Sequence, residues 1–295
     1  MLHNIKIGLG TSLYGREADH SRHISLLEYS LDIGYRLFDT GEAYSEGNCE
    51  KLIGNVLSSS RLSREDYYIS SKTTPFRIEN LEIKCKNSLD RLQTDYIDIY
   101  FLHWLEPFQK NLDSIKIIIE LFVNLKENNF IKHFGLSNFT IDELNLWKQA
   151  EANLGINILE FAQYRYNLIL NSADAELNNY VCNELKLKTM FHSPFGGGHI
   201  AGYSRPPLPK GSYYGDFWED IRIKKLIPLA VAMNISVPQL ILLYLHRWDN
   251  SIAIPKSFNK EHLKDNFTFL EHKKEELDPR VIKYIEKLFP LNSNS

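Results

Sequence analysis

Residues 67–103 read YYISSKTTPFRIENLEIKCKNSLDRLQTDYIDIYFLH. Two apolar runs of strand length, 67–72 and 97–103, stand on either side of a helical pattern over 79–92. A strand, a helix and a second strand in this order predict a βα unit of a parallel sheet. Both runs end in an ionisable side chain, Lys72 and His103, which the interior of a strand does not require.

The same alternation continues along the rest of the 295-residue chain. Other runs of strand length lie at 5–10, 35–40, 132–137, 158–163, 188–193 and 251–257. Helical patterns lie at 21–34, 113–129, 140–153 and 236–248. Thr140 stands three residues before Glu143, a capping-box spacing, and Ser236 precedes a Pro in the first turn. About eight βα units predict an α/β fold, a (β/α)8 TIM barrel, as a single domain over residues 1–295.

Two segments depart from this pattern, and the composition limits the partners of the chain. Residues 194–219 are rich in Gly, Pro and aromatics and predict a long functional loop, while 290–295 predict a frayed tail. A net charge of -3 with mixed signs predicts no nucleic-acid partner. No apolar run approaches about 18 residues, and no secretory signal opens the chain, so we expect no membrane contact and a cytoplasmic location. The oligomeric state is left open.

Polar side chains stand where the predicted strands end. They are Asp39 with Tyr44 in the next loop, Lys72, His103, Ser137 with Asn138, and Gln163. Barrel enzymes place their chemistry at this end, so the four ionisable groups predict an acid–base site. Each one alone also has a structural explanation, because an aspartate can cap a loop and a histidine can be a satisfied core residue.

Six ordered motifs resemble those of the aldo-keto reductase family. They are FDTGEAY (38–44), SSK (70–72), YFLHW (100–104), FGLSNF (134–139), HSPFGGG (192–198) and IPKSFNKEHLKDN (254–266). The resemblance implies an NAD(P)H-dependent oxidoreductase that reduces aldehydes, ketones or sugars. Tyr44 would be the general acid, with Lys72 lowering its pKa and Asp39 holding the lysine. His103 would orient the substrate oxygen, and Trp104 would line the substrate pocket.

The resemblance also implies where a nicotinamide cofactor binds. The implied contacts are Thr11, Ser12, Asp39, Ser137, Asn138, Gln163, His192, Ser193, Gly196, Lys256, Ser257, His262, Asp265 and Asn266. Ser137, Asn138 and Gln163 would bind the carboxamide, and the ring at 192 would stack on the nicotinamide. A dinucleotide-binding G-x-G-x-x-G is missing after the first strand, which argues against a Rossmann domain.

Three positions depart from the family pattern. His262 replaces an arginine that contacts the 2′-phosphate of NADP, so we expect NADP with a weakened preference and NAD as a plausible alternative. His192 replaces the usual tyrosine, and a flat imidazole can still stack. Ser12 replaces a tryptophan that walls the substrate pocket in many relatives. Tyr14, Trp104 or an aromatic among 213–218 could supply that wall instead.

Two alternatives to a reductase remain open at this point. The chain could be a cofactor-binding regulatory or scaffold subunit with little turnover, because such a protein keeps its nicotinamide contacts. It could also be an isomerase or lyase that uses Lys72 as a Schiff-base amine.

Overall fold

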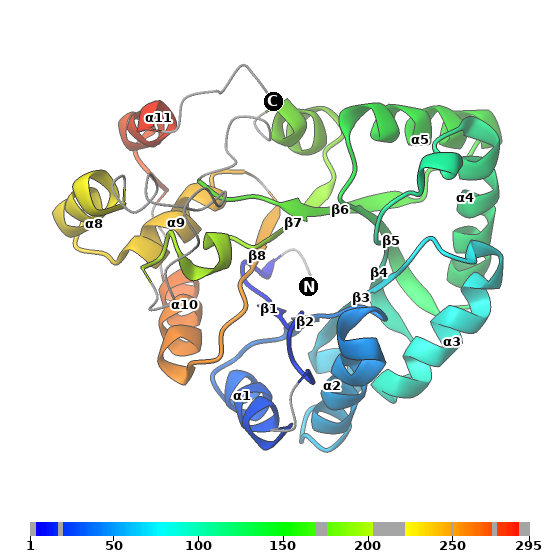
Figure 1. The fold of residues 1–295 in the computed structure, drawn as a ribbon, viewed down its shortest axis with the longest axis horizontal. Coiled ribbons are helices and arrows are strands. Elements are labelled where there is room, and N and C mark those ends of the chain that lie inside the picture. Colours follow the sequence, from blue (N-terminus) through cyan, green and yellow to red (C-terminus); the bar gives the residue numbers. More distant parts are fainter. Residues whose placement is uncertain are drawn as a thin grey trace.

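The computed structural model describes residues 4–16, 20–168, 176–202, 222–248, 250–272 and 276–288. Within these residues, eight parallel strands lie side by side in sequence order (Figure 1). They are β1 (Leu9–Gly10), β2 (Leu37–Asp39), β3 (Tyr68–Thr73), β4 (Ile97–Leu102), β5 (Ile131–Ser137), β6 (Leu159–Arg165), β7 (Lys188–His192) and β8 (Ser251–Ile254). The tail at 290–295 and most of the predicted loop, 203–219, lie outside the described residues.

The sheet closes on itself through the first and last strands. Ile7 forms a parallel bridge with Ala253, and the Gly10 amide donates to the Pro255 carbonyl oxygen at 3.0 Å. A Cβ atom at Gly10 would lie 2.7 Å from the Ile254 carbonyl oxygen, so glycine permits this approach. The strand predicted at 5–10 is therefore shorter than expected, because only Leu9–Gly10 pairs with β2. The predicted (β/α)8 barrel is confirmed.

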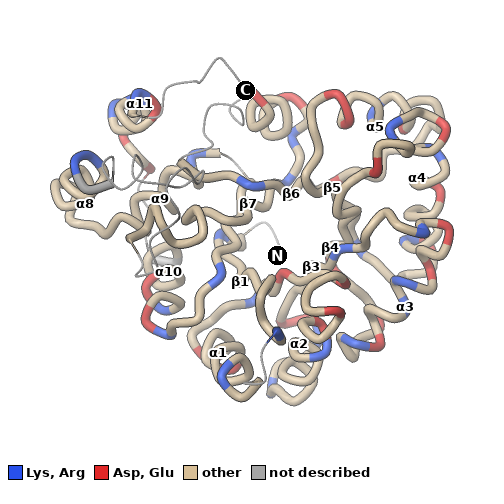
Figure 2. The backbone as a smooth tube through the Cα atoms, in the orientation of Figure 1, with Lys and Arg blue, Asp and Glu red and all other residues tan. Residues whose placement is uncertain are grey.

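Helices surround the barrel and follow the strands in the chain (Figure 1). They are α1 (His20–Asp32), α2 (Asn48–Ser58), α3 (Leu81–Leu92), α4 (Leu112–Glu127), α5 (Ile141–Leu154), α8 (Ile227–Ala232), α9 (Val237–Leu245), α10 (Lys260–His272) and α11 (Pro279–Leu288). Both predicted helix starts are confirmed, Thr140 with its capping box and Ser236 with Pro in the first turn, and Ser236 also forms a capping box. Acidic and basic residues are interspersed on the helices, whereas the strands are largely uncharged (Figure 2).

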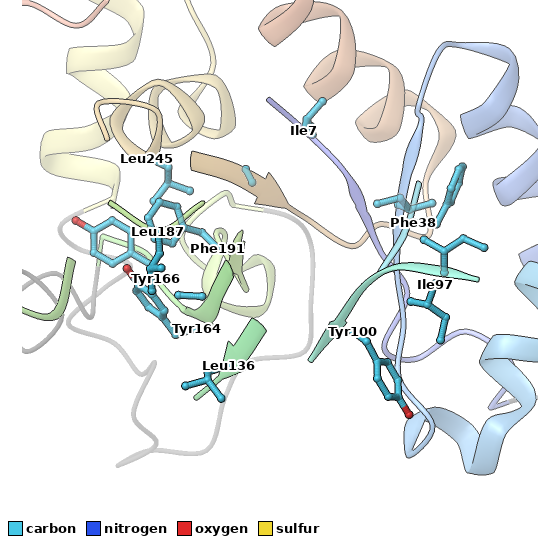
Figure 3. Close-up of a cluster of buried hydrophobic side chains, with 14 of the residues drawn as sticks. Ile7, Phe38, Ile97, Tyr100, Leu136, Tyr164, Tyr166, Leu187, Phe191 and Leu245 are labelled. Atoms are coloured by element: carbon cyan, nitrogen blue, oxygen red, sulfur yellow. The ribbon is translucent and has the colours of Figure 1, made fainter. Parts of the chain in front are cut away.

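Apolar side chains fill the barrel and the layer between the barrel and the helices. Phe101 and Phe161, from β4 and β6, meet edge to face with centroids 6.5 Å apart, across the position of β5. A Cβ atom at Gly135 of β5 would lie 2.3 Å from the Phe101 ring, so this glycine makes room for it. Phe38 of β2, Tyr100 of β4 and Phe191 of β7 belong to the larger core cluster (Figure 3).

The described α-helices are 6 to 16 residues long. No single helix in this part of the chain is both long enough and apolar enough to cross a bilayer. Only the bent pair formed by 224–232 and 237–245 has the length and the apolar composition of a membrane span, and only when the two segments are taken together.

Candidate active site

A buried ion pair joins the ends of β2 and β3. Lys72 Nζ lies 2.9 Å from Asp39 Oδ1 and 2.8 Å from Oδ2, and it donates to the Thr40 carbonyl oxygen at 2.6 Å. The two side chains are only 1% and 4% exposed. Burial is the largest single cause and lowers the pKa of Lys72, but the Asp39 and Tyr44 charges and hydrogen bonds together outweigh it, so the net pKa is raised. Lys72 is therefore a fixed positive charge within the barrel.

Two further donors hold the Asp39 carboxylate. Ser70 Oγ and Gln163 Nε2 each donate to Asp39 Oδ1 at 2.8 Å. Alternation along β3 places Ser70 on the same side of the sheet as Lys72, two residues later. The sequence prediction left out Ser70, although this spacing could have indicated it. Gln163 was assigned to the nicotinamide carboxamide, and in the structure its amide nitrogen contacts Asp39.

Tyr44 begins a short 3-10 turn, Tyr44–Gly47, directly above the ion pair. Lys72 Nζ lies 4.8 Å from the centroid of its ring, and the His103 ring lies 5.9 Å away, edge to face. Burial raises the pKa of the phenol, and the Lys72 charge lowers it. The lysine thus acts in the expected direction, but burial is larger and the net pKa lies above its ordinary value. Tyr44 keeps its proton at neutral pH.

His103 follows β4 and is a neutral imidazole. Burial, followed by the charges of Lys72 and His192, lowers its pKa to about 3. Its Nδ1 atom is buried and has no hydrogen-bond partner among the described residues. The neighbouring Trp104 ring lies 4.7 Å away, and Trp104 Nε1 donates to Glu106 at 3.0 Å.

This low pKa gives a testable pH dependence. We expect His103 to contribute no inflection to log(kcat/KM) between about pH 5.5 and pH 8, because it gains a proton only near its depressed pKa. The measurement is a pH–rate profile alongside NMR of 15N-labelled histidine rings. An acid limb near the ordinary histidine pKa of about 6.5 that is lost in His103→Gln would contradict the neutral assignment.

A chain of hydrogen bonds connects the ends of β5 and β7. His192 Nε2 lies 3.1 Å from Asn138 Oδ1, and His192 Nδ1 lies 3.2 Å from Ser193 Oγ. Asn138 Nδ2 donates in turn to Ser137 Oγ at 3.0 Å and to the His103 carbonyl oxygen at 3.2 Å. Burial is the main cause that lowers the pKa of His192 to about 3. His192, which is expected to stack on the nicotinamide, therefore also holds Asn138, which is expected to bind the carboxamide. The sequence did not indicate this contact.

A cleft of about 630 Å³ opens over these strand ends. The predicted residues that line it are Thr11, Ser12, Asp39, Tyr44, His192, Ser193, Lys256, Ser257 and His262. Gly197 and Gly198 line it in place of the predicted Gly196. The predicted residues that do not line it are Lys72, His103, Trp104, Ser137, Asn138, Gln163, Asp265 and Asn266. Arg22 also lines the cleft and was missed by the sequence analysis.

Two expectations around the cleft need correction or refinement. Tyr14 was a candidate for the substrate wall, but it is fully buried and stacks on His23, with its hydroxyl donating to the Ser257 carbonyl oxygen at 2.7 Å. It packs the core and forms no wall. Asp265 accepts from Gln239 Nε2 at 2.9 Å, and the buried Asn266 Oδ1 has no partner among the described residues. The aromatic candidates at 213–218 lie outside the described residues.

Comparison with known proteins agrees with the fold. The sequence model of the aldo/keto reductase family matches residues 6–289. The chain is 27% identical to methylglyoxal reductase YeaE of Escherichia coli, over 96% of this chain and 90% of the relative. It is 29% identical to methylglyoxal reductase DkgA of Yersinia pestis, over 84% and 79%.

The solved structures include an aldo/keto reductase from Klebsiella pneumoniae in complex with NADP and acetate. Its TM-score is 0.77 at 26% identity, covering 98% of this chain and 92% of that one. A thermostable aldo-keto reductase, Tm1743, has a TM-score of 0.76 at 26% identity, covering 96% and 94%. With a family match along nearly its whole length and a closed barrel of eight parallel strands, this chain belongs to the aldo/keto reductase family.

Proposed function

We propose that this oxidoreductase reduces small aldehydes and ketones with NADPH, and that Tyr44 delivers the proton. The observation that carries the proposal is the buried Asp39–Lys72 pair beneath Tyr44, at the floor of a cleft large enough for a cofactor. A charged lysine and a protonated phenol at this distance are suited to proton delivery to a carbonyl oxygen in the cleft.

Two features of the described residues fit a nicotinamide cofactor. Gln163 Oε1 is buried and has no partner, and a carboxamide amino group would satisfy this acceptor. Gly197 and Gly198 line the cleft, where the lack of side chains permits backbone to approach a pyrophosphate. The other proposed nicotinamide contacts that line the cleft are Thr11, Ser12, His192 and Ser193. Ser137 and Asn138 do not line it, but hydrogen bonds connect them to His192. Two similar solved structures contain NADP or NADPH, which supports the same cofactor here.

The cofactor, when bound, supplies the hydride to the carbonyl carbon. Tyr44 holds the proton that the carbonyl oxygen must gain, and its raised pKa ensures that the proton is present before the reaction. The Lys72 ammonium stabilises the phenolate that remains. Asp39, held by Ser70 and Gln163, keeps that ammonium charged and in place.

His103 positions the carbonyl oxygen in this proposal. A neutral imidazole can donate one N–H to that oxygen and does not compete with Tyr44 for the proton. Trp104 stands next in the chain and does not line the cleft, so its proposed contact with the substrate rests on its place beside His103. The centroid of its ring lies 4.7 Å from that of His103, with the two planes tilted by 49°, so it limits how far the imidazole can turn.

The relatives point to the substrate class. YeaE and DkgA are named methylglyoxal reductases, which supports a small dicarbonyl compound as the substrate of this chain. A sugar aldehyde is the second candidate of the same chemical class. The test follows the loss of NADPH absorbance with methylglyoxal, a panel of ketones and open-chain sugars. Cofactor binding without consumption on any carbonyl would overturn the proposal and favour a regulatory subunit.

A Schiff-base mechanism at Lys72 is disfavoured by the geometry. An imine-forming amine must lose its proton, whereas Asp39 raises the pKa of Lys72 and three oxygens accept from its ammonium group. Lys72 is also 1% exposed.

A further inference from the structure

The part of the cleft around Lys256 is formed by two segments distant in the sequence. Lys256 and His262 follow β8, whereas Arg22 belongs to α1. Helices α1 and α10 are neighbours in the outer ring (Figure 1). Lys260 Nζ donates to Ser25 Oγ at 2.8 Å between them. This packing brings a guanidinium from the first helix to the wall of the cleft.

The backbone that follows β8 holds Arg22 in this position. Arg22 Nη2 donates to the Phe258 carbonyl oxygen at 3.0 Å. The Phe258 ring stacks on Tyr14 with centroids 5.3 Å apart and lies 5.4 Å from His23. The Tyr14 hydroxyl fixes the preceding carbonyl oxygen, that of Ser257. The acceptor for Arg22 is therefore part of a packed aromatic cluster.

His262 supplies no positive charge to this part of the cleft at neutral pH. Burial lowers its pKa, although Asp265 and Glu261 act in the opposite direction. Two backbone amides in the first turn of α10 already donate to a side chain. Asn259 Oδ1 accepts from the Glu261 amide at 2.8 Å and from the His262 amide at 3.4 Å. Among the described residues that line the cleft, the side chains that carry positive charge are Lys256 and Arg22.

We propose that Arg22 binds the 2′-phosphate of NADP and sets the preference of this chain for NADP over NAD. The inference rests on the proposed function, in which NADPH occupies the cleft. A guanidinium carries five N–H donors in a fixed fork, so it can contact a phosphate while it donates to a carbonyl oxygen. Arg22 thus takes the part of the arginine that the family resemblance places at position 262.

The experiment measures binding in Arg22→Gln by quenching of tryptophan fluorescence. We expect the Kd for NADPH to rise about 10-fold, the size of one charge-assisted phosphate contact, and the Kd for NADH to stay unchanged. The probe 2′,5′-ADP, which lacks the nicotinamide, should lose affinity by the same factor, whereas 5′-ADP should not. The Kd of Arg22→Lys for NADPH should lie between those of the wild type and Arg22→Gln, because lysine keeps the charge and loses the fork of N–H donors.

Two further variants make the result specific. Lys260→Gln removes a neighbouring cation that does not line the cleft and should leave both dissociation constants unchanged. His262→Arg in the Arg22→Gln background should restore NADPH affinity. An equal change for NADPH and NADH, or none for either, overturns the role of Arg22 while NADPH-dependent reduction by the wild type still stands. A wild type that binds neither cofactor overturns the proposed function itself.

Discussion

Replacing Tyr44 with phenylalanine is expected to lower kcat by about 100- to 10,000-fold, the usual contribution of a positioned general acid. The dissociation constant for NADPH should change little, because the aromatic ring stays beside His103 and only the hydroxyl is lost. Steady-state kinetics with methylglyoxal and a fluorescence titration of the cofactor measure the two quantities separately. A variant that keeps wild-type kcat would exclude Tyr44 as the proton donor.

The matched control is Tyr100→Phe. Tyr100 is a fully buried tyrosine on β4, and it does not line the cleft. The same loss of one phenolic hydroxyl should leave kcat unchanged there. A comparable fall in both variants would attribute the effect to a general disturbance of the barrel.

Replacing Lys72 with methionine is expected to lower both stability and activity. The substitution leaves the Asp39 carboxylate buried without its cation, which costs about 3 to 5 kcal/mol in the free energy of unfolding. It also removes the charge that stabilises the Tyr44 phenolate, so kcat should fall together with stability. Urea unfolding followed by circular dichroism measures the first effect, and kinetics at a temperature where the variant is folded measures the second.

A double variant separates these two effects. Asp39→Asn combined with Lys72→Met removes both charges, and we expect much of the lost stability to return. Ser70 and Gln163 can still donate to the remaining side-chain oxygen at position 39. The activity should stay low, because the ammonium beneath Tyr44 is gone. Recovery of kcat together with stability would show that Lys72 acts only through folding.

The barrel and its ionisable cluster could be predicted because both depend on local patterns. Alternating strand and helix periods set the fold, and polar residues at strand ends meet at one face of any such barrel. Asp39 and Lys72 end adjacent strands in the sequence, so their contact follows from the order of the strands. The raised pKa of Tyr44 could not be predicted, because it depends on how completely the phenol is buried.

Contacts between elements that are distant in the sequence could not be predicted, because they depend on how those elements pack. Arg22 reaches the cleft only because α1 docks beside α10, and nothing in the helical pattern at 21–34 indicates that neighbour. The bond between His192 and Asn138 similarly spans β5 and β7, with β6 between them. Tyr14 packs in the core and not at the cleft because it stacks on His23, a contact that the sequence does not indicate.

The bridge between Ile7 and Ala253 has a consequence for biosynthesis. The first strand of the barrel completes its pairing only with the last, so a chain emerging from the ribosome cannot close the barrel until β8 has been translated. Until then β1 has β2 on one side and an open edge on the other, which exposes unpaired amides and carbonyls to other chains. Nascent chains therefore need protection from association for most of their synthesis.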